Sequence, residues 1–137
     1  MVGFERILVP VDFGESAPVV LQTAAGFARA CGGKLDVLHV CALHGEGVAE
    51  AERELARVLP DDLRDVLGSH GVVRALSPEL GILHAARERR TQLVVMGTHG
   101  RSGLKHVLIG SVAERVVQLA ECPVLTVRRA GHRFEHP

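Results

Sequence analysis

Five short apolar runs alternate with longer segments of helical periodicity, and this alternation constrains the fold more than any other feature of the chain. Runs with almost no polar residues are typical of strands that are covered on both faces of a sheet. Strands that alternate with helices are typical of a parallel sheet with right-handed crossovers. We therefore expect an α/β, doubly wound sandwich with helices on both faces. The expected strands are 6–11, 34–41, 72–76, 92–96 and the run from Pro123 to Arg128.

The helical segments carry recognisable start and stop signals. Ser16 is placed to cap a helix that tolerates Pro18 in its first turn, and Gly32 can end it. Ser77 followed by Pro78 predicts the start of another helix. We expect the first helix to bury a stripe made of Val20, Ala24, Phe27, Ala28 and Cys31.

Two further helices complete the pattern. One carries Val48, Leu55 and Leu59 and is expected to kink or restart at Pro60. The other is expected over 111–120, with Val112, Val116 and Leu119 facing inward.

Three separate segments leave the carboxyl ends of expected strands. They are the turn that begins at Asp12, the strand end at Val40 and Cys41, and a glycine loop that begins at Gly97. In doubly wound folds, ligands bind beyond the carboxyl ends of the strands, where the strand order reverses. The sequence therefore predicts that these segments share one crevice.

The glycine loop has the chemistry of a phosphate site. Gly97, Gly100, Gly110 and Ser111 follow the spacing G-x2-G-x9-G-S, and a helix begins at the end of the loop. Glycine lets the backbone come close to a ligand, and the N–H groups and dipole of a helix N-terminus favour an anion.

Two familiar phosphate sites are excluded by their own patterns. A dinucleotide site requires G-x-G-x-x-G after the first strand, where this chain has Asp12-Phe13-Gly14-Glu15-Ser16. A Walker A loop requires lysine directly after its last glycine and a hydroxyl residue after the lysine. Gly103-Leu104-Lys105-His106 has neither.

Composition narrows the partners. The 137 residues carry 16 basic and 16 acidic side chains and no Trp or Tyr, which argues against phosphate neutralisation and base stacking on nucleic acid. We expect one domain over 1–130 and a polar tail over 131–137. Signal-peptide and membrane-span patterns are lacking, so we expect a cytoplasmic protein without a membrane partner. Cys31, Cys41 and Cys122 have no CxxC spacing and are interpreted as reduced core residues.

The chain resembles the universal stress protein family over residues 4–128. The resemblance is carried by ILVPVDFGESA near the start and by VVMGTHGRSGLKHVLIGSVAERVVQLAECPVLTVR near the end. It implies a flavodoxin/Rossmann-like sheet of order 3-2-1-4-5, a dimer and, in the ATP-binding branch, a nucleotide crevice. The complete glycine pattern is that of the ATP-binding branch.

Site residues follow from the resemblance by position. Pro10, Val11 and Asp12 would border the adenosine, and Val40 would offer backbone groups to the adenine. Met96 and Gly97 would line the ribose side. The phosphates would be surrounded by Gly100, Arg101, Gly110, Ser111 and Val112.

Several of these residues have ordinary alternative roles. Asp12 can cap a turn, but its place in the crevice favours contact with the nucleotide or with Mg²⁺ held mainly by phosphates. Ser111 can act as a helix cap, and Arg101 can be a solvated charge. His39 is interpreted as a hydrogen-bonded strand histidine. A direct metal site at His99 and His106 is disfavoured, because no carboxylate cluster accompanies them.

Three functions remain open. The leading hypothesis is a stress-response or signalling protein in which ATP (or ADP or AMP) with Mg²⁺ modulates dimerisation or the binding of an unidentified protein. The dimer is expected to pair the strands from Pro123 to Arg128 edge to edge. The alternatives are an interaction protein without nucleotide and a weak ATPase or phosphotransferase. We expect no primary enzymatic role, because the sequence shows neither a nucleophile–base pair nor a G-x-S-x-G motif.

Overall fold

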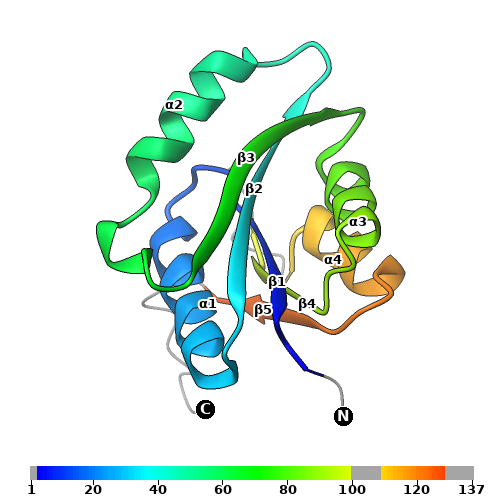
Figure 1. Ribbon diagram of the computed structural model, residues 1–137. Helices are drawn as coiled ribbons and strands as arrows, with labels where there is room; N and C mark the ends of the chain where they lie inside the picture. Colours follow the sequence, from blue (N-terminus) through cyan, green and yellow to red (C-terminus); the bar gives the residue numbers. More distant parts are fainter. Residues whose placement is uncertain (1–2, 100–108, 129–137) are drawn as a thin grey trace, which may run out of the picture.

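The computed structural model describes residues 3–99 and 109–128. Its described part contains a sheet of five parallel strands in the order β3-β2-β1-β4-β5 (Figure 1). The strands are β1 (Arg6–Pro10), β2 (Lys34–Ala42), β3 (Leu67–Ala75), β4 (Leu93–Gly97) and β5 (Val124–Val127). The α/β doubly wound fold and the strand order expected from the sequence are confirmed.

Helices cover both faces of the sheet. They are α1 (Ala17–Cys31), α2 (Val48–Val58), α3 (Pro78–Glu88) and α4 (Ser111–Leu119), with a short 3-10 helix, η1 (Asp61–Leu63), after α2. Helices α1 and α2 lie on one face and α3 and α4 on the other (Figure 1). None of the described helices has the length and apolar character that crossing a membrane would require.

Two apolar cores result, one on each face. Neighbouring residues of β1 alternate between them: Ile7 and Val9 pack with α1 and α2, whereas Leu8 packs with α3 and α4. The same alternation explains why both β1 and β4 are buried along almost their whole length. A strand that buries both faces must be apolar throughout, so these runs were visible in the sequence.

Strand β3 was predicted too short. It begins at Leu67 and has nine residues, whereas the sequence pattern predicted only 72–76. Its first half carries exposed Ser69 and His70, because β3 is an edge strand with β2 as its partner. Because an edge strand carries polar side chains, the first half of β3 does not form an apolar run in the sequence.

The buried stripe of α1 was also predicted wrongly. Its buried residues include Leu21 and Ala25, whereas Phe27 and Cys31 are exposed. The helix turns its alanine-rich side to the sheet, so the larger Phe27 is left outside. The core role predicted for the three cysteines therefore holds for buried Cys41, fails for Cys31, and applies only in part to the half-buried Cys122.

The helix ends agree with the sequence in part. Gly32 ends α1 with a φ of 71°, in the left-handed region that favours glycine. Ser77 caps α3 by accepting a hydrogen bond from the Leu80 N–H. Ser16 occupies the N-cap position of α1, but its side chain makes no cap hydrogen bond because its backbone is already helical (φ −81°, ψ −12°). The capping role predicted for Ser16 is therefore wrong.

Candidate functional site

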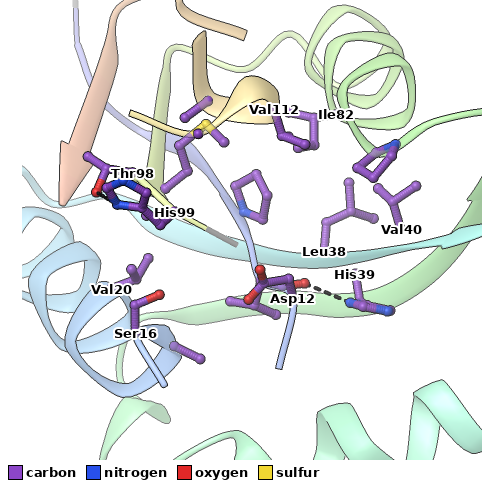
Figure 2. Close-up of a pocket in the computed structure, with 18 of the residues that line it drawn as sticks. Asp12, Ser16, Val20, Leu38, His39, Val40, Ile82, Thr98, His99 and Val112 are labelled. Atoms are coloured by element: carbon purple, nitrogen blue, oxygen red, sulfur yellow. Dashed lines mark hydrogen bonds between the residues drawn. The ribbon is translucent and has the colours of Figure 1, made fainter. Parts of the chain in front are cut away.

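A cavity of about 400 Å³ lies at the carboxyl ends of β1, β2 and β4 (Figure 2). Strands β1 and β4 are neighbours in the sheet, but the chain leaves β1 towards β2 and leaves β4 towards β5. This is the point at which the strand order reverses, where doubly wound folds bind ligands. The volume falls in the range of small-molecule sites.

Every predicted site residue in the described part of the chain lines this cavity. Pro10, Val11 and Asp12 come from the end of β1, and Val40 comes from β2. The remaining lining residues predicted from the sequence are Met96, Gly97, Gly110, Ser111 and Val112. Gly100 and Arg101 lie outside the described residues. The crevice predicted from three separate segments is thus a single space in the structure.

The cavity has two distinct ends. Figure 2 shows Thr98 and His99 on one side and His39 and Val40 on the other, with Asp12 between them. Apolar side chains, among them Leu38, Val40 and Ile82, line the part next to β2 and α3. The shape suits an elongated ligand with an apolar, flat part and a polar part.

We call the end made by Gly97, Thr98, Gly110 and Ser111 the glycine rim. The Thr98 N–H donates to Val127 O at 3.1 Å, and the Gly110 N–H donates to Thr98 O at 2.5 Å. These bonds bring the start of α4 back against the end of β4. A Cβ on Gly97 would lie 3.1 Å from Ser16 Oγ, so glycine here permits close packing on the start of α1.

Helix α4 presents its N-terminus to the cavity. Gly110 is its N-cap, with an extended backbone (φ −71°, ψ 163°), and Ser111 is the first helical residue. The alternative role of Ser111 as the cap is therefore wrong. Because Gly110 has no side chain, it gives no capping hydrogen bond to the first N–H groups of α4, and the positive end of the helix dipole lies at the cavity wall.

The turn after β1 is tightly shaped. The Asp12 carboxylate accepts a hydrogen bond from the Gly14 N–H at 3.0 Å, which closes an Asx turn. Phe13 between them has a φ of 66°, a left-handed conformation that is costly for a large side chain. Its ring stacks on the His39 ring, with 4.0 Å between centroids. The turn thereby fixes Asp12 at the cavity wall.

His39, Cys41 and Glu46 form what we call the polar cluster, at the end of β2. The buried His39 ring contacts Val11 O through Nδ1 at 2.7 Å and Glu46 Oε1 through Nε2 at 2.6 Å. The role predicted for His39, a hydrogen-bonded strand histidine, is confirmed. Burial raises the pKa of the Cys41 thiol, and the neighbouring Glu46 carboxylate raises it further.

Sequence reasoning missed Glu46, Ser16 and Thr98 as cavity residues. Glu46 lies in a bend between β2 and α2 and reaches the cavity only because that bend folds back over His39. The spacing H-x-C-x4-E from His39 to Glu46 was visible in the sequence. His99, considered with His106 as a metal pair, instead contacts Thr98 Oγ1 at 3.0 Å, and His106 lies outside the described residues.

Comparison with known proteins gives a consistent result. The model of the universal stress protein family matches residues 3–128. Universal stress protein YxiE of Bacillus subtilis is 30% identical over 148 residues, covering 91% of this chain and 99% of that protein. The structure of UspA from Lactobacillus plantarum superposes with a TM-score of 0.80 at 21% identity, covering 93% of this chain and 100% of that one.

Two further structural neighbours contain adenine nucleotides. A universal stress protein in complex with cAMP has a TM-score of 0.70 at 22% identity and covers 92% of this chain and 98% of its own. The universal stress protein of Archaeoglobus fulgidus in complex with dAMP has a TM-score of 0.68, also at 22% identity, with the same coverage of both chains. At these identities the likeness establishes the shared fold.

Proposed function

This chain belongs to the universal stress protein family, and from that premise we propose that it binds an adenine nucleotide, ATP first among them, in the cavity between β1 and β4. The observation that carries the proposal is the glycine rim. It combines a close-packed glycine at the end of β4 with the N-terminus of α4, a combination suited to phosphate. The bound cAMP and dAMP of two structural neighbours support nucleotides as a class.

The residues present fit such a ligand. The apolar end of the cavity, near Val40 and Ile82, suits the flat adenine ring, and the backbone of Val40 would supply polar contacts to its edge. Asp12 lies between the two ends, where the ribose and first phosphates would be. Mg²⁺ would be held mainly by phosphate oxygens, with the Asp12 carboxylate as a protein contact.

Bound nucleotide would regulate dimerisation or partner binding, and its hydrolysis would not be the main activity. We place the dimer interface at β5, a short apolar edge strand whose residues are all half-buried in the single chain. Bound ATP would contact Gly97 at the end of β4, and the next residue, Thr98, is hydrogen-bonded through its N–H to Val127 O of β5. This gives a route from the cavity to a dimer or to a protein partner in the cytoplasm.

The decisive experiment uses Gly110, whose extended backbone accepts other N-cap residues. In Gly110→Asp the new carboxylate stands against the phosphates, so we expect ATP affinity measured by calorimetry with Mg²⁺ to fall roughly 100-fold or more. Gly110→Asn is the matched control, because it has the same size and capping ability without the charge. We expect it to lose much less affinity.

Both variants should unfold at the wild-type temperature or slightly above it, because Asp and Asn are good N-caps. The proposal fails if wild-type protein gives neither heat nor a thermal shift with ATP and Mg²⁺. It also fails if Gly110→Asp and Gly110→Asn bind ATP equally well. Light scattering with and without ATP then tests the effect on the dimer.

Only slow ATP hydrolysis is expected. Turnover would require a group that positions water and one that stabilises charge on the departing phosphate. Phosphate release well above the uncatalysed background, and lost in Asp12→Ala, would show instead that the protein is an enzyme.

A further inference from the structure

The polar cluster contains three different metal-ligating groups at one place. A ring nitrogen of His39, Sγ of Cys41 and a carboxylate oxygen of Glu46 all lie within 4.8 Å of one another. His39 and Cys41 are two residues apart on β2, so their side chains share the sheet face that α1 and α2 cover. Glu46 closes the group from the bend that precedes α2.

The hydrogen bond between His39 Nδ1 and Val11 O leaves Nε2 as the ring nitrogen that can bind a metal. Val11 O can only accept, so the 2.7 Å contact means that His39 Nδ1 carries the hydrogen and donates it. Nε2 is then the atom that faces Glu46. A histidine that donates through one nitrogen to a backbone carbonyl and presents the other is the usual arrangement of a metal ligand.

We propose that His39, Cys41 and Glu46 form a transition-metal site, and that Zn²⁺ is the ion it suits best. Nitrogen, thiolate sulfur and carboxylate oxygen are together the donors that Zn²⁺ takes, whereas Mg²⁺ and Ca²⁺ take oxygen. Three protein ligands leave a fourth tetrahedral position. Since His39 and Glu46 also line the cavity, we expect water from the cavity to supply the fourth ligand.

The site requires a small adjustment on binding. His39 Nε2 and Glu46 Oε1 are 2.6 Å apart, a hydrogen-bond distance, whereas two such ligands on tetrahedral zinc stand about 3.3 Å apart. Glu46 can make this movement, because it lies in a bend and its side chain is 31% exposed. The metal replaces the proton held between these atoms and the thiol proton of Cys41, and both protons pass to solvent.

Cobalt titration of chelator-treated protein, without nucleotide, tests the site. Co²⁺ bound by these ligands should give thiolate-to-cobalt charge-transfer absorbance and strong tetrahedral d–d bands that saturate at one ion per chain and disappear when Zn²⁺ is added. Cys41→Ser should remove the charge-transfer band. Cys31→Ser is the matched control, because Cys31 is exposed and far along α1, and it should keep the band.

Glu46→Gln gives a second test that does not alter a fully buried side chain. It should keep the thiolate band but weaken Co²⁺ binding at least tenfold, with the fold checked by circular dichroism. The inference is overturned if wild-type protein shows no thiolate band, if the band survives Cys41→Ser, or if Glu46→Gln binds Co²⁺ like the wild type. In these cases the cluster is only a hydrogen-bonded support for β2.

The site stands apart from the proposed nucleotide function. The Gly110 N–H donates to Thr98 O, and Figure 2 shows Thr98 across the cavity from His39. Gly110→Asp should therefore bind Co²⁺ with wild-type affinity even where ATP binding is lost. Failure of the nucleotide proposal would therefore leave this result untouched, and the reverse also holds.

Discussion

The glycine rim and the polar cluster, which lie on opposite sides of the cavity, are built from different groups. The glycine rim is made of backbone: a strand end, a helix N-terminus and residues with little or no side chain. The polar cluster is made of side chains, and His39 in it is almost fully buried and hydrogen-bonded through both ring nitrogens. Backbone N–H groups serve an anion, whereas side-chain lone pairs serve a proton or a cation. A single cavity thus joins two chemically opposite ends.

The contrast has an energetic side. Groups in the polar cluster are satisfied by each other, so removing one leaves others buried without that contact. The small residues of the glycine rim leave room for a ligand, so a substitution there should lower nucleotide affinity more than it lowers the free energy of unfolding. Substitutions at the two ends should therefore separate stability from affinity.

The largest effect on stability is expected from His39→Phe. Phenylalanine keeps a ring beside Phe13 but loses the hydrogen bonds to Val11 O and Glu46. We expect the free energy of unfolding to fall by about 2–4 kcal/mol, because a buried carbonyl and a half-buried carboxylate lose their partner. Urea unfolding in the presence of chelator measures it.

Glu46→Gln is the control for that experiment. Glutamine can still hydrogen-bond to the His39 ring, so the loss should stay below about 1 kcal/mol. A His39→Phe variant as stable as the wild type would show that packing, and not hydrogen bonding, holds this end of the cavity.

Much of this architecture could be predicted from the sequence. The strands β1 and β4 bury both faces and are therefore continuous apolar runs, and the spacing from Gly97 to Ser111 indicated a helix N-terminus at a strand end. Such features can be recognised in the sequence because each depends on residues that are close together in the chain.

The parts that could not be predicted depend on distant contacts. Glu46 lines the cavity because a bend folds it onto His39, and the spacing H-x-C-x4-E does not by itself show that the chain bends back there. The buried side of α1 was predicted wrongly because Leu21 and Phe27 are both apolar. Which of the two is buried depends on how the helix packs on the sheet. The polar start of β3 is explained by its edge position, which is a property of the whole sheet.

An intermediate effect is expected from Gly97→Ala in the glycine rim. The new Cβ would lie 3.1 Å from Ser16 Oγ and 3.5 Å from Val20 Cγ2, both of which belong to cavity-lining residues. We expect the free energy of unfolding to fall by about 1 kcal/mol, because Ser16 must move away from the new methyl group. ATP affinity should fall roughly tenfold, because the methyl group narrows the cavity. Calorimetry and urea unfolding on the same samples give the two values.

Combining Gly97→Ala with Ser16→Ala sharpens this result, since the second change removes the crowded oxygen. The double variant should regain stability without regaining affinity. If Gly97→Ala bound ATP with wild-type affinity, this glycine would be needed only for packing. The expectation that substitutions in the glycine rim lower affinity more than stability would then be wrong at Gly97.

The smallest effect is expected at the Arg29–Asp65 ion pair, which lies on the surface and sets the scale for polar contacts outside the cavity. Nε and Nη2 of Arg29 hold the Asp65 carboxylate at 2.8 and 3.0 Å, and the hydrogen bond from Arg29 lowers the pKa of Asp65 below its ordinary value of 3.8. A carboxyl group with a lowered pKa stabilises the folded protein at pH values above its ordinary pKa, and this contribution is lost as the pH falls through the pKa of the folded state.

Asp65→Asn should therefore destabilise the protein only slightly at neutral pH, because both side chains are exposed and screened by water. In urea unfolding the difference from wild type should shrink at high salt and vanish towards acid pH. A loss as large as that of His39→Phe would contradict the assignment of the strong polar contacts to the cavity, since an exposed pair would then match a buried one.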